Sequence, residues 1–271
     1  MIQKRFTARE IVCMAVLCRE RSLYGIPDEF RRIPEEQRQR EMQWALDRLV
    51  DRGVVEMDFD GRVSMNSDYL WLIESICRCE RCVTLERREA EVKKEAFIFW
   101  RTGDKFLIAE LDGETYLFSL ADPLIMRGIL EECVLTSSVR SLGGEAVVPN
   151  TELKKAARFR RQGNYTEAIR ILRQNGAEER LVQFNLDWTA EKASFVFLRK
   201  MEIRDGVCTQ NEISYGAAEG LVLSVQKTVV NYATCTVFRE VDGETVSVAL
   251  AAAADAFLGE RKEGESLWQK L

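Results

Sequence analysis

Three cysteines in the motif CRCERC lie close enough in sequence to hold a metal ion or to exchange a disulfide. They are Cys77, Cys79 and Cys82, and the Cys-x-x-Cys spacing of the last two is typical of zinc and redox sites. A structural zinc site needs four ligands, and the neighbouring sequence offers no second cysteine pair. We therefore expect no metal and no cofactor, with these thiols packed as small apolar side chains between a helix and a strand.

The chain contains no histidine among its 271 residues, although it has eight cysteines. This absence excludes Ser-His-Asp and Cys-His catalysis and histidine-based metal hydrolysis. A fourth ligand for the cysteine motif could come only from Cys133, Cys208 or Cys235, brought near by folding. We therefore expect that the protein is not an enzyme.

The tetrapeptide Asp-Gly-Glu-Thr occurs twice, at 112–115 and 242–245. A phosphate-binding loop needs more glycines, and a calcium site needs a third oxygen ligand at a suitable spacing. Asp-Gly between two alternating apolar runs is instead the signal of a β-hairpin, so we predict that both copies are hairpin turns. The strands expected after the two turns place Tyr116, Phe118 and Leu120 on one face of the first, and Val246, Val248 and Leu250 on one face of the second.

The two copies of this tetrapeptide lie in longer segments that match each other, which predicts a chain built from two copies of one unit. Each copy would contain helices, three strands, an Asp-Gly turn, a fourth strand and a helix. The second copy would carry an extra segment near 200–232. The matching segments are 79–89 with 178–188, 95–101 with 193–199, and 106–122 with 236–252.

A duplicated unit of this kind predicts an α+β fold. The antiparallel sheets of the two copies would be related by a pseudo-two-fold axis and flanked by helices. We expect a first helix and sheet unit at 1–136, a polar, glycine-containing linker at 137–150 and a second unit at 151–271. Together they would form one compact domain.

The N-terminal part is similar to a winged helix, because a predicted helix at 34–53 leads into a predicted hairpin at 54–65. In a winged helix this second helix would enter a major groove, so a winged-helix transcriptional regulator is the main alternative function. The helix charges nearly cancel and the chain carries a net charge of −5, so we expect no nucleic-acid partner. The opposing charges are Arg38, Arg40 and Arg48 against Glu35, Glu36, Glu41 and Asp47.

The extra segment near 200–232 breaks the symmetry of the duplication, which indicates a role acquired by the second copy. It contains the long apolar run LVLSVQKTVV, and an edge strand of this kind suits partner binding. The alternative is a longer hairpin without such a role. The candidate partner-binding residues are Phe195, Phe197, Tyr215, Leu221 and Leu223.

The apolar run IVCMAVLC at 11–18 is the only candidate for a targeting or membrane segment. A membrane-spanning helix needs about 20 apolar residues, and a signal peptide needs small residues before a cleavage site. We predict that the run is the buried face of the first helix. The expected protein is cytoplasmic, with reduced thiols, no insertion into a membrane, and a monomeric or weakly dimeric state.

The order of the segments resembles that of the EspG family of type VII (ESX) secretion chaperones. The segments AREIVCMAVLC, ALDRLVDRGVV, DYLWLIESICRCERCV and FLIAELDGETYLFSL precede a linker, two helices and a second sheet unit. Leu49, Arg52 and Gly53 match the L-x-x-R-G helix end of that family. The cysteine motif departs from the family pattern and suggests a distant branch, of the kind found in Firmicutes.

The resemblance implies a cytosolic, non-catalytic adaptor. Such a protein would bind a helical secreted protein, a helper protein or a heterodimer of these through its sheet and C-terminal helices. It would shield an exposed apolar tip of that partner and deliver the partner to the secretion machinery.

Overall fold

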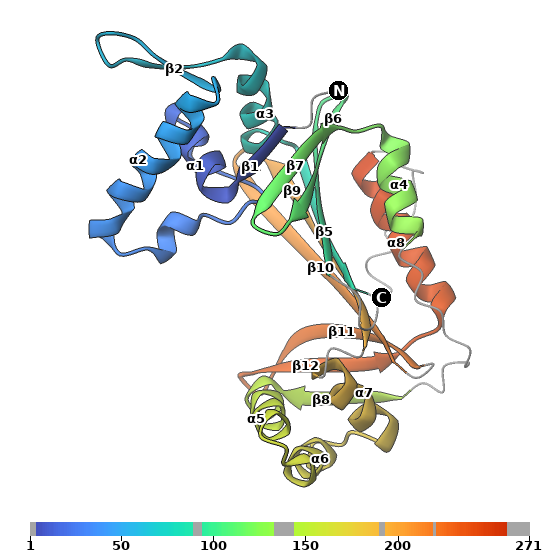
Figure 1. The fold of residues 1–271 in the computed structure, drawn as a ribbon. Coiled ribbons are helices and arrows are strands. Elements are labelled where there is room, and N and C mark those ends of the chain that lie inside the picture. The colour runs from blue at the N-terminus through green and yellow to red at the C-terminus, as the bar shows by residue number, and fades with distance from the viewer. Residues whose placement is uncertain (1–3, 89–93, 133–143, 190–192, 219–220, 259–271) are drawn as a thin grey trace. The chain divides into compact units, whose positions relative to one another are not determined.

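The structure is a computed structural model. It describes residues 4–88, 94–132, 144–189, 193–218 and 221–258 (Figure 1). Strands and helices alternate in blocks along the chain, and the pairings whose register is known are antiparallel. The predicted α+β class is therefore confirmed.

Most strands belong to one ten-stranded sheet, and two short strands pair separately. The short pair is β2 (Val55–Met57) with β3 (Val63–Met65). The large sheet runs in the order β1 (Lys4–Thr7), β7 (Thr115–Leu120), β6 (Lys105–Asp112), β5 (Glu95–Thr102), β4 (Arg81–Arg88), β9 (Ser194–Arg204), β10 (Val207–Ala218), β11 (Leu221–Val230), β12 (Ala233–Glu240) and β8 (Glu145–Pro149).

The helices fall between β1 and β4, after β7, between β8 and β9, and after β12 (Figure 1). A short 3₁₀ helix, η1 (Glu29–Arg32), directly precedes the second α-helix. The α-helices are α1 (Ala8–Leu17), α2 (Glu35–Asp51), α3 (Ser67–Cys77), α4 (Pro123–Glu131), α5 (Asn150–Arg161), α6 (Tyr165–Gln174), α7 (Glu179–Thr189) and α8 (Gly243–Leu258).

The strand order follows the same plan from either end of the sheet. One strand, β1 or β8, precedes a block of three α-helices. Four consecutive strands, β4–β7 or β9–β12, then run back from the middle of the sheet to pair with that first strand. A helix, α4 or α8, follows the fourth strand. The chain is thus duplicated in topology, with β4–β7 equivalent to β9–β12.

The predicted alignment of the two copies is wrong in the segment 178–188. We expected a strand equivalent to 79–89, whereas the structure shows helix α7, which occupies the place of α3. Val182 and Phe184 fit an alternating strand pattern, but Leu181 and Phe184 also share a helical face, and all three are buried. Because of this error the two copies were aligned one strand out of step. Strand β9 was matched with β5, whereas the order of the sheet makes it equivalent to β4.

The two copies of Asp-Gly-Glu-Thr have different structures. The first is the β6–β7 hairpin turn, as predicted, with Gly113 at a φ of 63°. The second begins α8, so the expected turn and the strand after it are wrong. The Asp242 carboxylate accepts a hydrogen bond from the Thr245 amide at 2.7 Å. Hydrogen bonds from Thr245 lower the pKa of Asp242, which is the behaviour of a helix N-cap.

The helical period explains why α8 forms after the second copy. Val246, Val248 and Leu250 alternate, but four consecutive alanines follow, and alanine has the highest helix propensity. Burial then recurs at helical rather than alternating spacing. The buried residues of α8 are Val246, Ala249, Leu250, Ala253, Ala254 and Phe257.

Contacts divide the chain into two compact units, each built from several separate stretches of the chain. The predicted linker overlaps β8, and its residues 137–143 lie outside the described residues. The division into 1–136 and 151–271 stays a prediction. Unit 1 comprises Met1–Thr84, Glu95–Met126 and Lys200–Gln210, and unit 2 comprises Leu85–Lys94, Arg127–Arg199 and Asn211–Leu271.

Unit 1 has an aromatic core beneath the N-terminal helices. Trp100 stacks on Phe118 with ring centroids 5.9 Å apart, and Phe6 of β1 lies 6.3 Å from Phe118. The indole N–H of Trp100 donates to the Tyr24 carbonyl oxygen at 2.7 Å, so its one polar group is satisfied inside the core. The run 11–18 falls largely within α1, and its inward side is buried as predicted.

The winged-helix-like segment of unit 1 is confirmed. Helix α2 leads into the β2–β3 hairpin, whose turn contains Gly61 at a φ of 73°. The Asp58 amide donates to the Arg62 carbonyl oxygen at 3.0 Å across that turn.

A buried carboxylate joins the first strand to the first two helices. Glu10 of α1 is only 1% exposed. It accepts a hydrogen bond from the Thr7 amide at 2.7 Å, which completes a capping box. Its other oxygen lies 3.1 Å from Arg52 and 3.4 Å from Arg48. Arg52 in turn stacks over the Phe6 ring at 4.6 Å, so the network extends into the core.

Unit 2 contains a smaller layered core. Helices α5, α6 and α7 lie against β8, β11 and β12 (Figure 1). Ala156, Leu172 and Phe184 come from the helices, and Leu223 and Phe238 come from the strands. Among the described helices of both units, none has the length and apolar composition required to cross a membrane.

Replacing Glu10 by alanine is expected to lower the free energy of unfolding by about 3 kcal/mol, because a buried ion pair and a helix cap are lost together. Urea denaturation followed by circular dichroism measures the change. Glu41→Ala is the matched control, since the Arg9–Glu41 pair is half-exposed and should contribute less than about 1 kcal/mol. Equal effects of the two substitutions would contradict the assignment.

Candidate partner-binding site

The cysteine motif contributes to the core of unit 1. Cys77, Cys79 and Cys82 are buried where α3 ends and β4 begins. Burial raises the pKa of Cys77 and of Cys79 to about 12, so both remain thiols at neutral pH and are poor nucleophiles and ligands. Within the described ranges, no three histidine, cysteine or acidic side chains are grouped so as to hold a metal ion.

The other cysteines considered as fourth ligands lie in different settings. Cys208 is exposed on β10 of unit 1, whereas Cys235 is buried on β12 of unit 2. Cys133 falls outside the described residues. The thiols therefore differ mainly in their access to solvent.

Thiol labelling with DTNB near pH 8 is expected to be fast at Cys208 and slow at Cys77 and Cys79 until the chain is denatured. Burial and the raised pKa both oppose formation of a thiolate at the two buried sites. Cys208→Ser should remove one rapidly reacting equivalent and leave the slow phase unchanged. Uniformly fast labelling of the native protein would contradict this expectation.

Two of the predicted partner-binding residues form a half-buried row on β9. The Arg88 guanidinium lies 5.0 Å from the ring centre of Phe195, and that of Arg199 lies 5.4 Å from the ring centre of Phe197. Arg199 also pairs with Glu212 of β10 at 2.9 Å. We call Phe195, Phe197, Arg88 and Arg199 the aromatic–arginine strip. Its rings are held by cation–π contacts yet retain exposed surface.

The other three predicted residues lie in the interior. Tyr215, Leu221 and Leu223 are buried, Leu223 completely, and burial raises the pKa of Tyr215. Leu221 and Leu223 pack in the core of unit 2 with the helices. A charged residue at Leu223 would therefore unfold the unit, so such a substitution cannot report on partner binding. The structure does not bring these side chains to the surface beside the aromatic–arginine strip.

Leu223→Ala is expected to lower the stability of the protein by about 3 kcal/mol, because it opens a cavity in a packed core. Val229→Ala on the same strand is the control, since Val229 is 68% exposed and should cost less than about 1 kcal/mol. Chemical denaturation of both variants measures the difference. Similar midpoints would show that Leu223 does not hold the core together.

Three groups of exposed apolar side chains were not predicted. Leu124 and Ile125 lie on the outer face of α4, opposite the buried Met126. The sequence offers three successive apolar residues here, and it does not show which of them faces the core. The remaining groups are Met57 and Phe59 on the β2–β3 hairpin, and Val229, Val230 and Tyr232 at the β11–β12 hairpin.

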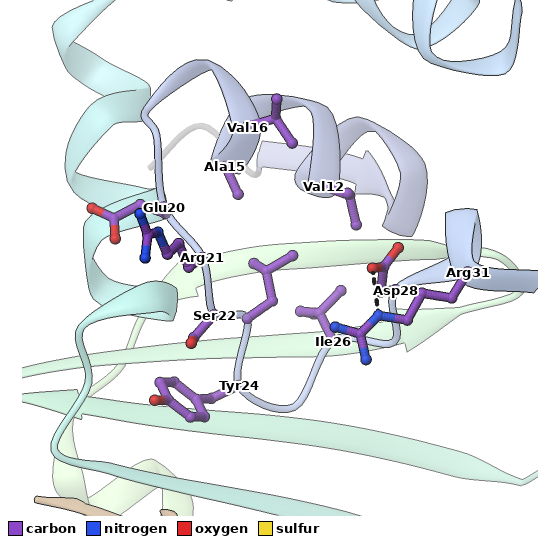
Figure 2. A pocket seen from close by; sticks show the side chains of 11 residues that line it. Val12, Ala15, Val16, Glu20, Arg21, Ser22, Tyr24, Ile26, Asp28 and Arg31 are labelled. Atoms are coloured by element: carbon purple, nitrogen blue, oxygen red, sulfur yellow. Dashed lines mark hydrogen bonds and ion pairs between the residues drawn. The ribbon is translucent and has the colours of Figure 1, made fainter. Parts of the chain in front are cut away.

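A cavity of about 380 Å³ lies in unit 1 between α1 and the segment that leads to η1 (Figure 2). Its walls are partly apolar, and three of its charged side chains, Glu20, Asp28 and Arg31, are paired. Asp28 pairs with Arg31 at 3.0 Å, and Glu20 accepts a hydrogen bond from Arg78 at 2.8 Å. The cavity can accept an apolar side chain, but it brings no acid and base together around a substrate. It is lined by Val12, Ala15, Val16, Glu20, Arg21, Ser22, Leu23, Tyr24, Ile26, Asp28 and Arg31.

Arg38 and Arg48 of α2, and Arg52 directly after it, hold that helix in place. Arg48 and Arg52, at its C-terminal end, pair with the buried Glu10, and Arg38 donates to the Phe30 carbonyl oxygen at 3.1 Å. These side chains are engaged within unit 1. The arrangement gives little support to a helix that presents arginines to the phosphates of DNA.

The comparison with solved structures identifies a similar fold. The Mycobacterium tuberculosis type VII secretion system chaperone EspG5, solved in complex with a PE25–PPE41 dimer, matches this chain with a TM-score of 0.51. The chain has an EspG-like fold. The match covers 94% of this chain and 96% of EspG5, at 12% sequence identity. No protein-family model and no curated protein matches the sequence.

Proposed function

We propose that this protein is a cytoplasmic chaperone or adaptor of a type VII secretion system. It binds a helical secreted protein, a helper protein or a heterodimer of these, and keeps that partner soluble and competent for export. The observation that carries the proposal is the similarity of fold over nearly the whole chain to a chaperone solved with a bound protein dimer. The proposed activity is binding, without catalysis.

The surface chemistry of unit 2 supports a binding role for the aromatic–arginine strip. Association is driven by the apolar area that two proteins remove from water, and aromatic and arginine side chains are enriched among the residues that dominate binding energy. Phe195 and Phe197 would contact the partner directly. Tyr215, Leu221 and Leu223 would contribute indirectly, by holding the strands beneath that surface in place.

Affinity purification of the tagged full-length protein from its native host, without crosslinker, tests the function. Mass spectrometry should identify a small helical secreted protein, and co-expression of that protein should increase its soluble yield. Recovery of DNA with no protein partner would favour the winged-helix regulator. Loss of the partner at moderate salt would contradict an apolar interface.

Phe195→Ala combined with Phe197→Ala is expected to weaken binding of the purified partner at least about tenfold, because two contact rings are removed. Phe59→Ala is the matched control, since Phe59 lies fully exposed on the hairpin of unit 1. Calorimetry measures the affinities, and circular dichroism verifies folding of each variant. If the control weakened binding as strongly as the double variant, the site would lie elsewhere.

Salt dependence separates the chaperone from the regulator. Partner binding through an apolar surface should change little between low and moderate ionic strength. DNA binding should weaken steeply over the same range, because bound counterions are released from the phosphates. Titrations of the secreted partner and of duplex DNA at two salt concentrations provide the comparison.

A further inference from the structure

Strand β11 has one edge that no described strand covers along most of its length. Its pairing with β10 comprises four residue pairs, from Tyr215–Ser224 to Ala218–Leu221. On its other side β11 pairs with β12 as far as Val230–Ala233. Among the described residues, 225–230 therefore have β12 as their strand partner on one side and none on the other.

The backbone groups along this open edge can be assigned from the register. Val222 accepts a hydrogen bond from the Val241 amide at 3.0 Å, on the β12 side, and Val230 faces Ala233 across a two-residue turn. Residues of a strand alternate in the side to which their N–H and C=O point. Val225, Lys227 and Val229 therefore direct their N–H and C=O groups toward the open edge.

The side chains at the end of this edge are apolar and exposed. Val229 is 68% and Val230 42% exposed, and Tyr232 is fully exposed in the turn. Asn231 and Tyr232 both have positive φ, of 48° and 62°. Glycine is the preferred residue at the second position of such a turn, so an exposed tyrosine held there is unfavourable for the backbone and indicates a role for its side chain.

The charge pattern indicates what the edge can bind. Lys227 is the only charged residue in 221–238, and that stretch contains no aspartate or glutamate. Proteins commonly protect open edges with several charges, prolines or bulges, whereas this one carries a single lysine. A second copy of the same edge would offer no carboxylate to Lys227, so self-pairing is disfavoured relative to an acidic partner.

We propose that the open edge of β11 at 225–230 is a strand-addition site for an extended segment of a partner protein. The added segment hydrogen-bonds to Val225, Lys227 and Val229, carries β-branched residues beside Val229, and places an acidic residue opposite Lys227. The site is built entirely from residues of unit 2. The argument for it does not use the similarity to a secretion chaperone, so this proposal can be tested separately from the proposed function.

The test uses the full-length protein and a short synthetic peptide in which valine and threonine alternate around one central glutamate. Fluorescence anisotropy of the labelled peptide gives the affinity, and hydrogen exchange followed by NMR reports individual amides. Binding should slow exchange at the amides of residues 225, 227 and 229 while those of unit 1 remain unchanged. Absence of protection at millimolar peptide would overturn the proposal.

A charge exchange tests the contact with Lys227. Lys227→Glu should weaken binding of the glutamate peptide about fivefold and strengthen binding of a peptide with lysine at the same position by a similar factor, because cross-strand charge pairs differ by about that amount. Equal affinities of both proteins for both peptides would exclude the predicted register.

A proline substitution tests the backbone contacts. Val229→Pro removes an N–H that points to the open edge and none that pairs with β12, so the protein should fold but no longer bind the peptide. Val229→Thr is the matched control, since it retains both the N–H and the branched side chain. Unchanged binding by the proline variant would overturn strand addition. Sedimentation showing that Val229→Pro dissolves a homodimer would identify a second copy as the occupant and overturn the proposed partner.

Discussion

Burial of a carboxylate against arginines ties separate elements together in each unit. Glu10 is removed from water, so it is stable only if Arg48, Arg52 and the capped backbone of α1 surround it. Those partners come from separate elements, and satisfying one charge therefore positions a strand and two helices at once. In unit 2 the buried Glu240 at the end of β12 similarly lies 3.1 Å from Arg180 of α7.

Local patterns in the sequence predicted the elements whose residues have only one compatible structure. The wing followed from Asp60-Gly61 between short apolar strands, and the first Asp-Gly-Glu-Thr turn followed from the runs on either side of it. The errors occurred where apolar positions fit two periods. Residues 178–188 and 242–252 both alternate in part, and only packing against the sheet, which the sequence does not show locally, selects the helix. Boundaries between units depend on contacts far apart in sequence, and so could not be read from composition.

The candidate site was less predictable than the fold because apolar strand residues can face either the core or a partner. Phe195 and Phe197 retain exposed surface, whereas Leu221 and Leu223 are buried by helices that are distant in sequence. The hydrophobicity of these residues is similar, and the difference arises from which face the helices cover. The exposed tyrosine of the β11–β12 turn was missed for a different reason. Asn-Tyr is not a typical sequence for that turn, so the hairpin offered no clear local signal.

The strand order of the large sheet is the same from both ends, and this symmetry bears on how such a chain could originate. Association of two identical subunits through equivalent strands, followed by fusion of their genes, would produce such an order. Fusion would release the halves from the requirement to be identical, and the two halves differ: the first contains the β2–β3 wing, whereas the second has longer strands. A symmetric ancestor could offer only the same surface twice. A chain in which the two halves differ can present two different surfaces.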